Sequence, residues 1–94
     1  MIKKILLEYL KANRVSAIMW INLVIDEEDD KIVDKILSWA DSLPTRSLMQ
    51  KIIKWAAKNL LQSNKNAILV AVEHYGNKGA EAIFDGVILL IELR

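Results

Sequence analysis

The first part of the chain alternates apolar and polar residues with helical spacing. Between Ile2 and Ala12, the apolar residues Ile2, Ile5, Leu6, Tyr9 and Leu10 share one face, and Lys4, Glu8 and Lys11 share the other. Asn13 fits a helix end at this point. The spacing therefore predicts an amphipathic helix over residues 2–12.

The clearest helical pattern covers residues 27–43. Its apolar positions recur every three or four residues, at Ile32, Val33, Ile36, Leu37, Ala40 and Leu43. Asp26 is placed to cap the free amides at the start, the four acids that follow suit the positive end of the helix dipole, and Pro44 predicts the end.

A further helix is predicted from Thr45 or Ser47 to about Gln62, because Ser47 and Gln50 have the spacing of a capping box. Its expected apolar face has Met49, Ile52, Ile53, Ala56 and Leu60 at the centre. Residues 63–66 are predicted to form a loop, with Asn66 capping a short helix that ends at Gly76.

Three segments, residues 15–25, 67–75 and 87–93, are too apolar or too β-branched for periodicity to separate a buried helix from a strand. Taken as helices, they predict an all-α fold, a compact bundle of four to five short helices. Taken as strands, they give an α+β fold with a small sheet. Similar fragments at Lys4, Lys35 and Lys51 recur at unequal spacing, which argues against a repeat protein.

Length and composition predict one domain over residues 1–94. Apolar residues make up 53% of the 94 residues, which is ample for one core, and the chain contains no cysteine. Glu8 and Lys11 interrupt any signal-peptide core, and the longest uncharged run, residues 15–25, is too short to span a bilayer. We therefore expect a cytoplasmic protein.

The residues that carry chemistry form no recognisable catalytic or metal-binding motif. The five consecutive acids from Asp26 to Asp30 lack the alternation and the glycine of a calcium loop, so we interpret them as helix-dipole partners. His74 is the single histidine, no serine lies in a nucleophile-elbow context, and the three glycines match no nucleotide-binding fingerprint. We expect no enzymatic activity, no cofactor and no bound metal.

The basic segment 46–65 is the strongest candidate for a binding surface. Lys51, Lys54 and Lys58 line one helical face with Trp55 at its edge, and residues 45–72 contain five Lys or Arg and no acid. Such a face suits phosphate contacts in a small nucleic-acid-binding protein, with residues 43–47 as the turn before a recognition helix. It equally suits a membrane surface, or simply the solvated side of a bundle helix.

A protein partner is our leading hypothesis, because the polar stripes of segments 47–62 and 80–93 are thin. A single chain is expected to leave five apolar side chains uncovered, namely Trp55, Leu61, Ile88, Leu89 and Leu93. Lys51, Lys54 and Lys58 would form a rim opposite Glu81, Asp85 and Glu92. The sequence thus predicts a non-enzymatic interaction or assembly module that forms a homo-oligomer or binds another protein, with a membrane-surface protein as the alternative.

Overall fold

The computed structural model describes residues 2–94, and all regular structure in this range is helical. The elements are α1 (Ile2–Ala12), α2 (Arg14–Asn22), α3 (Asp29–Ser42), α4 (Leu48–Ser63), α5 (Lys65–Tyr75), the short 3₁₀ helix η1 (Gly76–Lys78) and α6 (Ala80–Glu92). The prediction of an all-α fold is confirmed. The alternative with a sheet from residues 15–25, 67–75 and 87–93 is wrong, and six α-helices replace the expected four to five.

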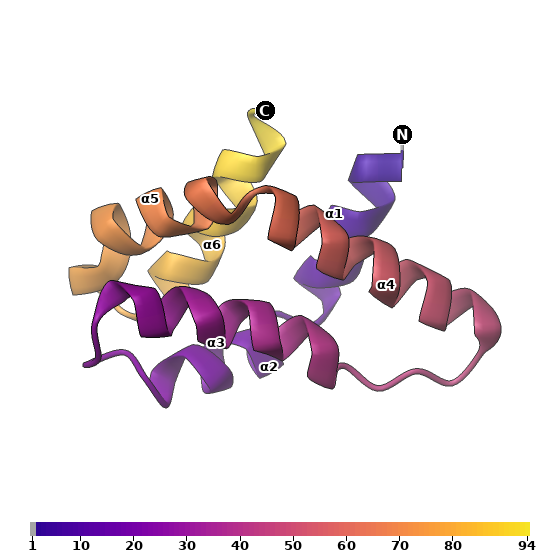
Figure 1. Cartoon of the computed structure of the whole chain (residues 1–94), viewed down its shortest axis with the longest axis horizontal. Coiled ribbons are helices and arrows are strands. Elements are labelled where there is room, and N and C mark those ends of the chain that lie inside the picture. Colours follow the sequence, from indigo (N-terminus) through magenta and orange to yellow (C-terminus); the bar gives the residue numbers. More distant parts are fainter. Residues whose placement is uncertain (1) are drawn as a thin grey trace.

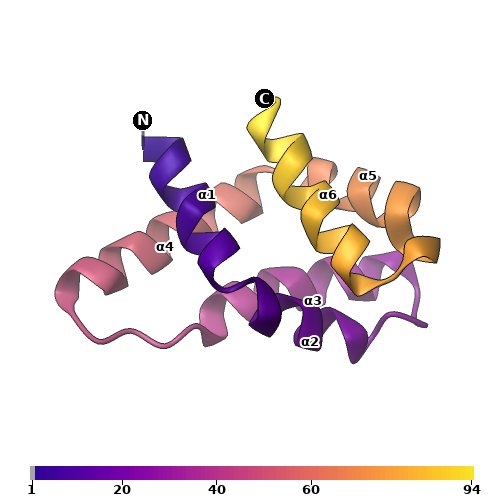
Figure 2. The same cartoon turned by 180° about the vertical axis from the view of Figure 1, so that it is seen from behind.

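The helices form two layers. Figure 1 shows α3, α4 and α5 in front, and Figure 2, from behind, shows α1, α2 and α6 covering them. Across the layers, α6 packs on α5, α1 packs on α4, and α2 packs on α3. The N-terminal half of α4 extends away from the other helices at one end of the long axis (Figure 1).

Two asparagines form the junctions between α1 and α2 and between α4 and α5. Asn13 and Asn64 adopt nearly the same backbone conformation, and each side-chain amide donates to the carbonyl four residues earlier, Tyr9 O at 2.9 Å and Leu60 O at 2.7 Å. Each thereby satisfies a free helix-end carbonyl, so a new helix begins one residue later. The predicted loop at residues 63–66 and the Asn66 cap are therefore wrong.

The predicted helix starts were right for α4 and wrong for α3. Ser47 Oγ accepts a hydrogen bond from Gln50 N at 3.2 Å, and Gln50 Oε1 accepts one from Arg46 N at 2.6 Å, so the capping interaction is confirmed. α3 begins at Asp29 instead of Glu27, and Asp26 lies in the preceding turn. Only Asp29 and Asp30 therefore occupy the first turn of α3.

The core lies between the layers and is centred on two aromatic side chains. Trp39 of α3 meets Phe84 of α6 edge to face, with ring centroids 5.5 Å apart. Trp39 Nε1 donates to Ser16 Oγ of α2 at 3.1 Å, which satisfies the one polar atom of the buried indole. This contact joins three helices from both layers.

The two halves of the chain repeat the same helix pairing. If α1, α2 and α3 are exchanged with α4, α5 and α6 in that order, three packed pairs become three other packed pairs. The pair α2–α3 becomes α5–α6, the pair α2–α6 becomes α3–α5, and the pair α3–α4 becomes α1–α6. The offset is 51 residues, the separation of Asn13 and Asn64. It also aligns buried positions, Leu10 with Leu61, Ile21 with Val72, Ile32 with Ile83, Val33 with Phe84, Ile36 with Val87 and Ala40 with Ile91. The helix packing thus has an approximate twofold correspondence between the first three and the last three α-helices of the described residues.

Candidate interaction surface

The N-terminal half of α4 exposes a row of large apolar side chains. Leu48 and Trp55 are 74% and 68% exposed, and Met49 and Ile52 are also exposed. Residues 48, 52 and 55 lie on one side of a helix at i, i+4 and i+7. Met49 and Ile52 were expected in the core, but α1 and α3 pack nearer the other end of α4, where Ala57 and Leu61 are buried.

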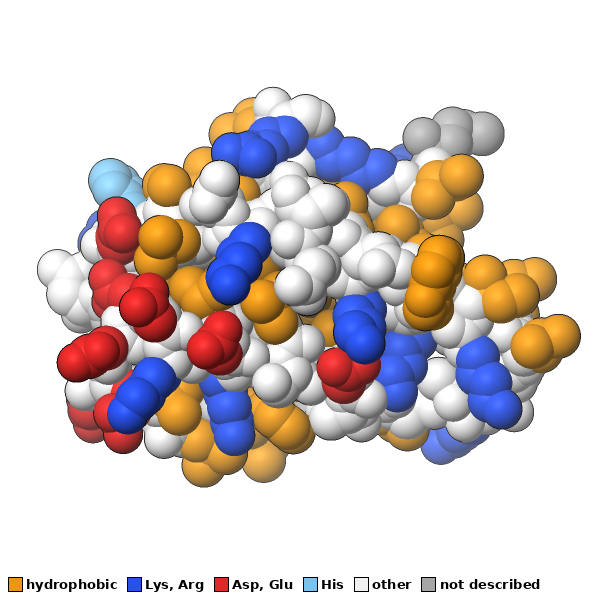
Figure 3. Space-filling model, in the orientation of Figure 1, with side chains coloured by type: hydrophobic (Ala, Val, Ile, Leu, Met, Phe, Trp, Pro, Cys, Tyr) orange, Lys and Arg blue, Asp and Glu red, His pale blue; other side chains and the backbone are white. Residues whose placement is uncertain are grey.

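Basic side chains border this row. Lys51 and Lys54 make no ion pair within the described residues, whereas Lys58 Nζ lies 2.7 Å from Asp41 Oδ1 of α3. An open groove of about 340 Å³ runs beside the row, lined by Asp41, Thr45, Lys51, Lys54, Trp55 and Lys58. Figure 3 shows hydrophobic and basic side chains together at this end of the molecule. The α4 face is the set of the exposed Leu48, Met49, Lys51, Ile52 and Trp55 together with the half-buried Lys54.

The predicted interface residues divide into two groups. Trp55, Leu89 and Leu93 are exposed, the last two at 46% and 73%. Leu61 and Ile88 are 1% and 5% exposed, so the expectation that a single chain leaves them uncovered is wrong. Both point into the core, because α4 and α6 are covered at these positions by other helices of the same chain.

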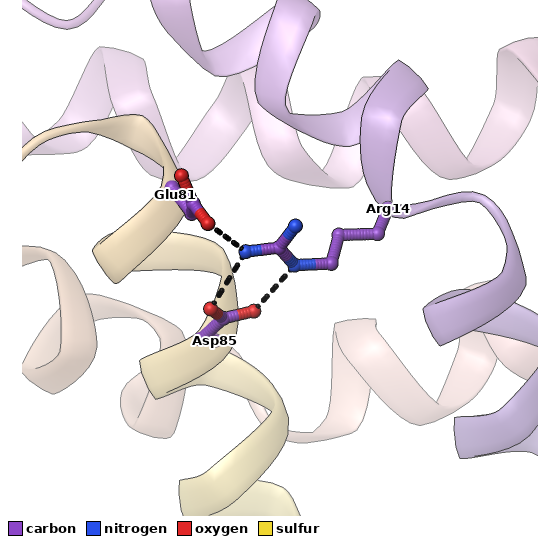
Figure 4. Close-up of polar contacts among 3 residues, drawn as sticks. All are labelled: Arg14, Glu81 and Asp85. Atoms are coloured by element: carbon purple, nitrogen blue, oxygen red, sulfur yellow. Dashed lines mark hydrogen bonds and ion pairs between the residues drawn. The ribbon is translucent and has the colours of Figure 1, made fainter.

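The acids of α6 face α2 instead of the lysines of α4. Figure 4 shows the guanidinium of Arg14 between Glu81 and Asp85, with Arg14 Nε and Nη2 each 2.9 Å from an Asp85 oxygen. The Arg14 hydrogen bonds lower the pKa of Asp85, and Asp85 and Glu81 together raise the pKa of Arg14. Glu81 and Asp85, which were predicted to line an interface rim opposite the α4 lysines, are thus already paired with Arg14 of the same chain.

The missed residue here is Arg14, which is separated from Glu81 and Asp85 by 67 and 71 positions. No local pattern in the sequence signals such a pairing. Glu92, the third acid of the predicted stripe, pairs with Lys11 of α1. The two ion-pair groups hold α6 against α1 and α2, and they leave the α4 lysines without these partners.

The opposite end of the molecule is acidic. Asp26, Glu28, Asp29, Asp30 and Asp34 make no ion pair within residues 2–94, and Leu23 beside them is exposed. Figure 3 shows Asp and Glu gathered at this end, over the turn from α2 to α3, while the α4 face lies at the other end of the long axis. The molecule measures 37 Å along that axis.

The described part of the chain contains neither a metal-ligand cluster nor a membrane-spanning helix. Within residues 2–94, no group of three or more His, Asp or Glu is arranged to hold a metal ion. None of the helices in that range combines the length and the apolar character that crossing a membrane requires. Comparison with protein-family models, curated proteins and solved structures finds no match. The α4 face combines exposed apolar side chains with basic ones, and the functional proposal rests on this combination.

Proposed function

We propose that the protein is a non-enzymatic interaction module that self-associates through the α4 face. The observation that carries this proposal is the row of exposed apolar side chains at residues 48, 49, 52 and 55 on one helix. Scattered single apolar residues are normal on protein surfaces, but contiguous ones bordered by charge mark contact sites. The row ends at Trp55, and tryptophan is among the residue types most enriched in binding hot spots.

The exposed apolar side chains of the α4 face could supply the binding free energy of a moderate interface. Burying roughly 400 Å² of apolar surface is worth on the order of 10 kcal/mol before association costs are subtracted. The unpaired Lys51 and Lys54 would lie at the rim, where charge sets orientation and contributes about 0–1 kcal/mol per exposed pair. Affinity would thus come from Leu48, Ile52 and Trp55.

A matched pair of variants tests the face. Trp55→Ser removes an exposed apolar side chain from the α4 face, and Leu89→Ser removes one from α6, on a different part of the surface. Sedimentation velocity at several concentrations is expected to show wild-type association that Trp55→Ser abolishes and Leu89→Ser leaves unchanged. Loss of association in Leu89→Ser alone would place the interface on α6 and contradict the proposal.

An anionic membrane surface is a second candidate, favoured by the position of the α4 face at one extremity of the molecule. There the apolar side chains could enter the acyl boundary while Lys51 and Lys54 meet the headgroups. Vesicles with and without anionic lipid test this candidate through tryptophan fluorescence. The Trp55→Phe variant keeps only Trp20 and Trp39, so subtracting its spectrum from that of the wild type isolates the signal of Trp55. A blue shift that appears only with anionic lipid and weakens with salt would support membrane binding.

A further inference from the structure

We propose that the α4 face of one copy docks on the acidic end of a second copy, so that the chains associate head to tail. This inference rests on the proposed self-association and names its geometry. The acidic end is defined as the exposed set Leu23, Asp26, Glu28, Asp29 and Asp30. It has the charge that the α4 face lacks, and it has an exposed apolar side chain of its own.

Charge complementarity selects this partner over a second α4 face. Two α4 faces pressed together would bring Lys51 and Lys54 of both copies into one interface, where the carboxylate that lines the same groove, Asp41, is already paired with Lys58. Like charges in a shared interface are unfavourable, and they oppose a twofold pairing of this face. At the acidic end, by contrast, Asp26, Glu28, Asp29 and Asp30 form no ion pair within the described residues that docking would break.

The correspondence between the two halves of the chain allows the start of α3 to be compared with the start of α6. At the 51-residue offset, residues 26–30 correspond to residues 77–81, where Glu81 is the single acid, and α6 nevertheless begins there. Only Asp29 and Asp30 lie in the first turn of α3, so helix-dipole stabilisation accounts for at most these two of the five consecutive acids.

The first turns of α4 carry the exposed Leu48, Met49 and Ile52. The acidic end and the α4 face carry opposite charge, so each supplies the charge that the other lacks. A lipid surface would occupy the α4 face alone and would leave the acidic end without a partner.

The two surfaces lie at opposite ends of the 37 Å axis, so a contact between them is heterologous. A heterologous contact leaves one free surface of each kind on a dimer, and further copies add until a ring closes or an open chain grows. The expected signature is a mass that rises beyond two chains with concentration and falls with salt.

Complementation between two disabled variants tests this geometry. Variant A, Ile52→Ser with Trp55→Ser, disables the α4 face. Variant B, Leu23→Ser with Asp26→Asn and Glu28→Gln, disables the acidic end, and it leaves Asp29 and Asp30 in the first turn of α3. Circular dichroism and thermal melts first confirm that both variants keep the wild-type helical content.

Each variant alone is expected to stay monomeric, and an equimolar mixture is expected to form a complex of two chains that grows no further. If B alone associates as the wild type does, or if the mixture remains monomeric, the head-to-tail contact is overturned while self-association stands. If A alone associates, the α4 face itself is wrong. A wild-type chain that is monomeric throughout and binds anionic vesicles would overturn both proposals in favour of the membrane.

Discussion

Replacing Gly86 with alanine tests the close packing of α5 against α6. Gly86 lies in the middle of α6, and an added Cβ would lie 2.3 Å from Tyr75 Cδ2, 2.5 Å from Cε2 and 3.2 Å from Cγ. Carbon atoms in contact are normally about 3.5–4.0 Å apart. The Tyr75 ring also meets the His74 ring edge to face at 4.9 Å and lies under Lys78 Nζ at 5.9 Å, so moving the ring disturbs these contacts.

Two opposing effects set the size of the change. Alanine in place of glycine within a helix stabilises by roughly 0.5–1 kcal/mol. Overpacking against the Tyr75 ring costs about 1–3 kcal/mol. We expect Gly86→Ala to lower the free energy of unfolding by about 0.5–2 kcal/mol, because the ring is displaced at its base as well as at its edge.

A double-mutant cycle with Tyr75→Ala in urea denaturation separates the two effects. In the Tyr75→Ala background the ring is gone, so Gly86→Ala should stabilise by about 0.5–1 kcal/mol, a reversal of sign. Gly76→Ala is the matched control, since Gly76 has helical φ and ψ and an added Cβ there meets nothing within 4 Å. Equal effects of Gly86→Ala in both backgrounds would refute the packing argument.

Three further predictions concern the junctions and the polar groups. Asn64→Ala should lower the free energy of unfolding by about 0.5–1.5 kcal/mol, measured by urea denaturation, because the helix-end carbonyl of Leu60 loses the shorter of its two side-chain hydrogen bonds and keeps the one from Ser63 Oγ. Tyr9→Phe should raise the free energy of unfolding by about 1 kcal/mol, since the Tyr9 hydroxyl is buried without a hydrogen-bond partner in the described structure; a loss of stability would show that the hydroxyl is satisfied. The pKa of Asp85 is lowered by Arg14, so the ion pair stabilises the fold above the unfolded-state pKa and is lost as the pH falls below about 4. Between pH 2 and 7, the melting temperature of Asp85→Asn should therefore fall less steeply in acid than that of the wild type.

The periodic segments could be predicted from the sequence because local spacing determines them. The bounds of α1 and the Ser47 cap of α4 follow from amphipathic spacing and capping chemistry, and both are confirmed. The junction at Asn64 could not be predicted from composition. A run of polar residues resembles a loop, whereas one asparagine side chain is sufficient to end a helix and begin the next.

Which part of an apolar face is buried depends on its neighbours, and these are distant in sequence. The pattern of α4 gives the same weight to Ile52 and Ile53, yet Ile52 is exposed and Ile53 packs against the core. Likewise, Glu81 and Asp85 were predicted as rim residues of an interface, and local spacing did not reveal that Arg14 of α2 pairs with them within the chain. The candidate site could therefore be predicted around Trp55, but its limits required the tertiary structure.

The most direct test of the account is the solution mass of the wild-type chain, measured by light scattering across a wide concentration range at low and high salt. Self-association through the α4 face predicts a mass above that of one 10.7 kDa chain, rising with concentration and falling with salt. A mass of one chain under every condition would contradict it.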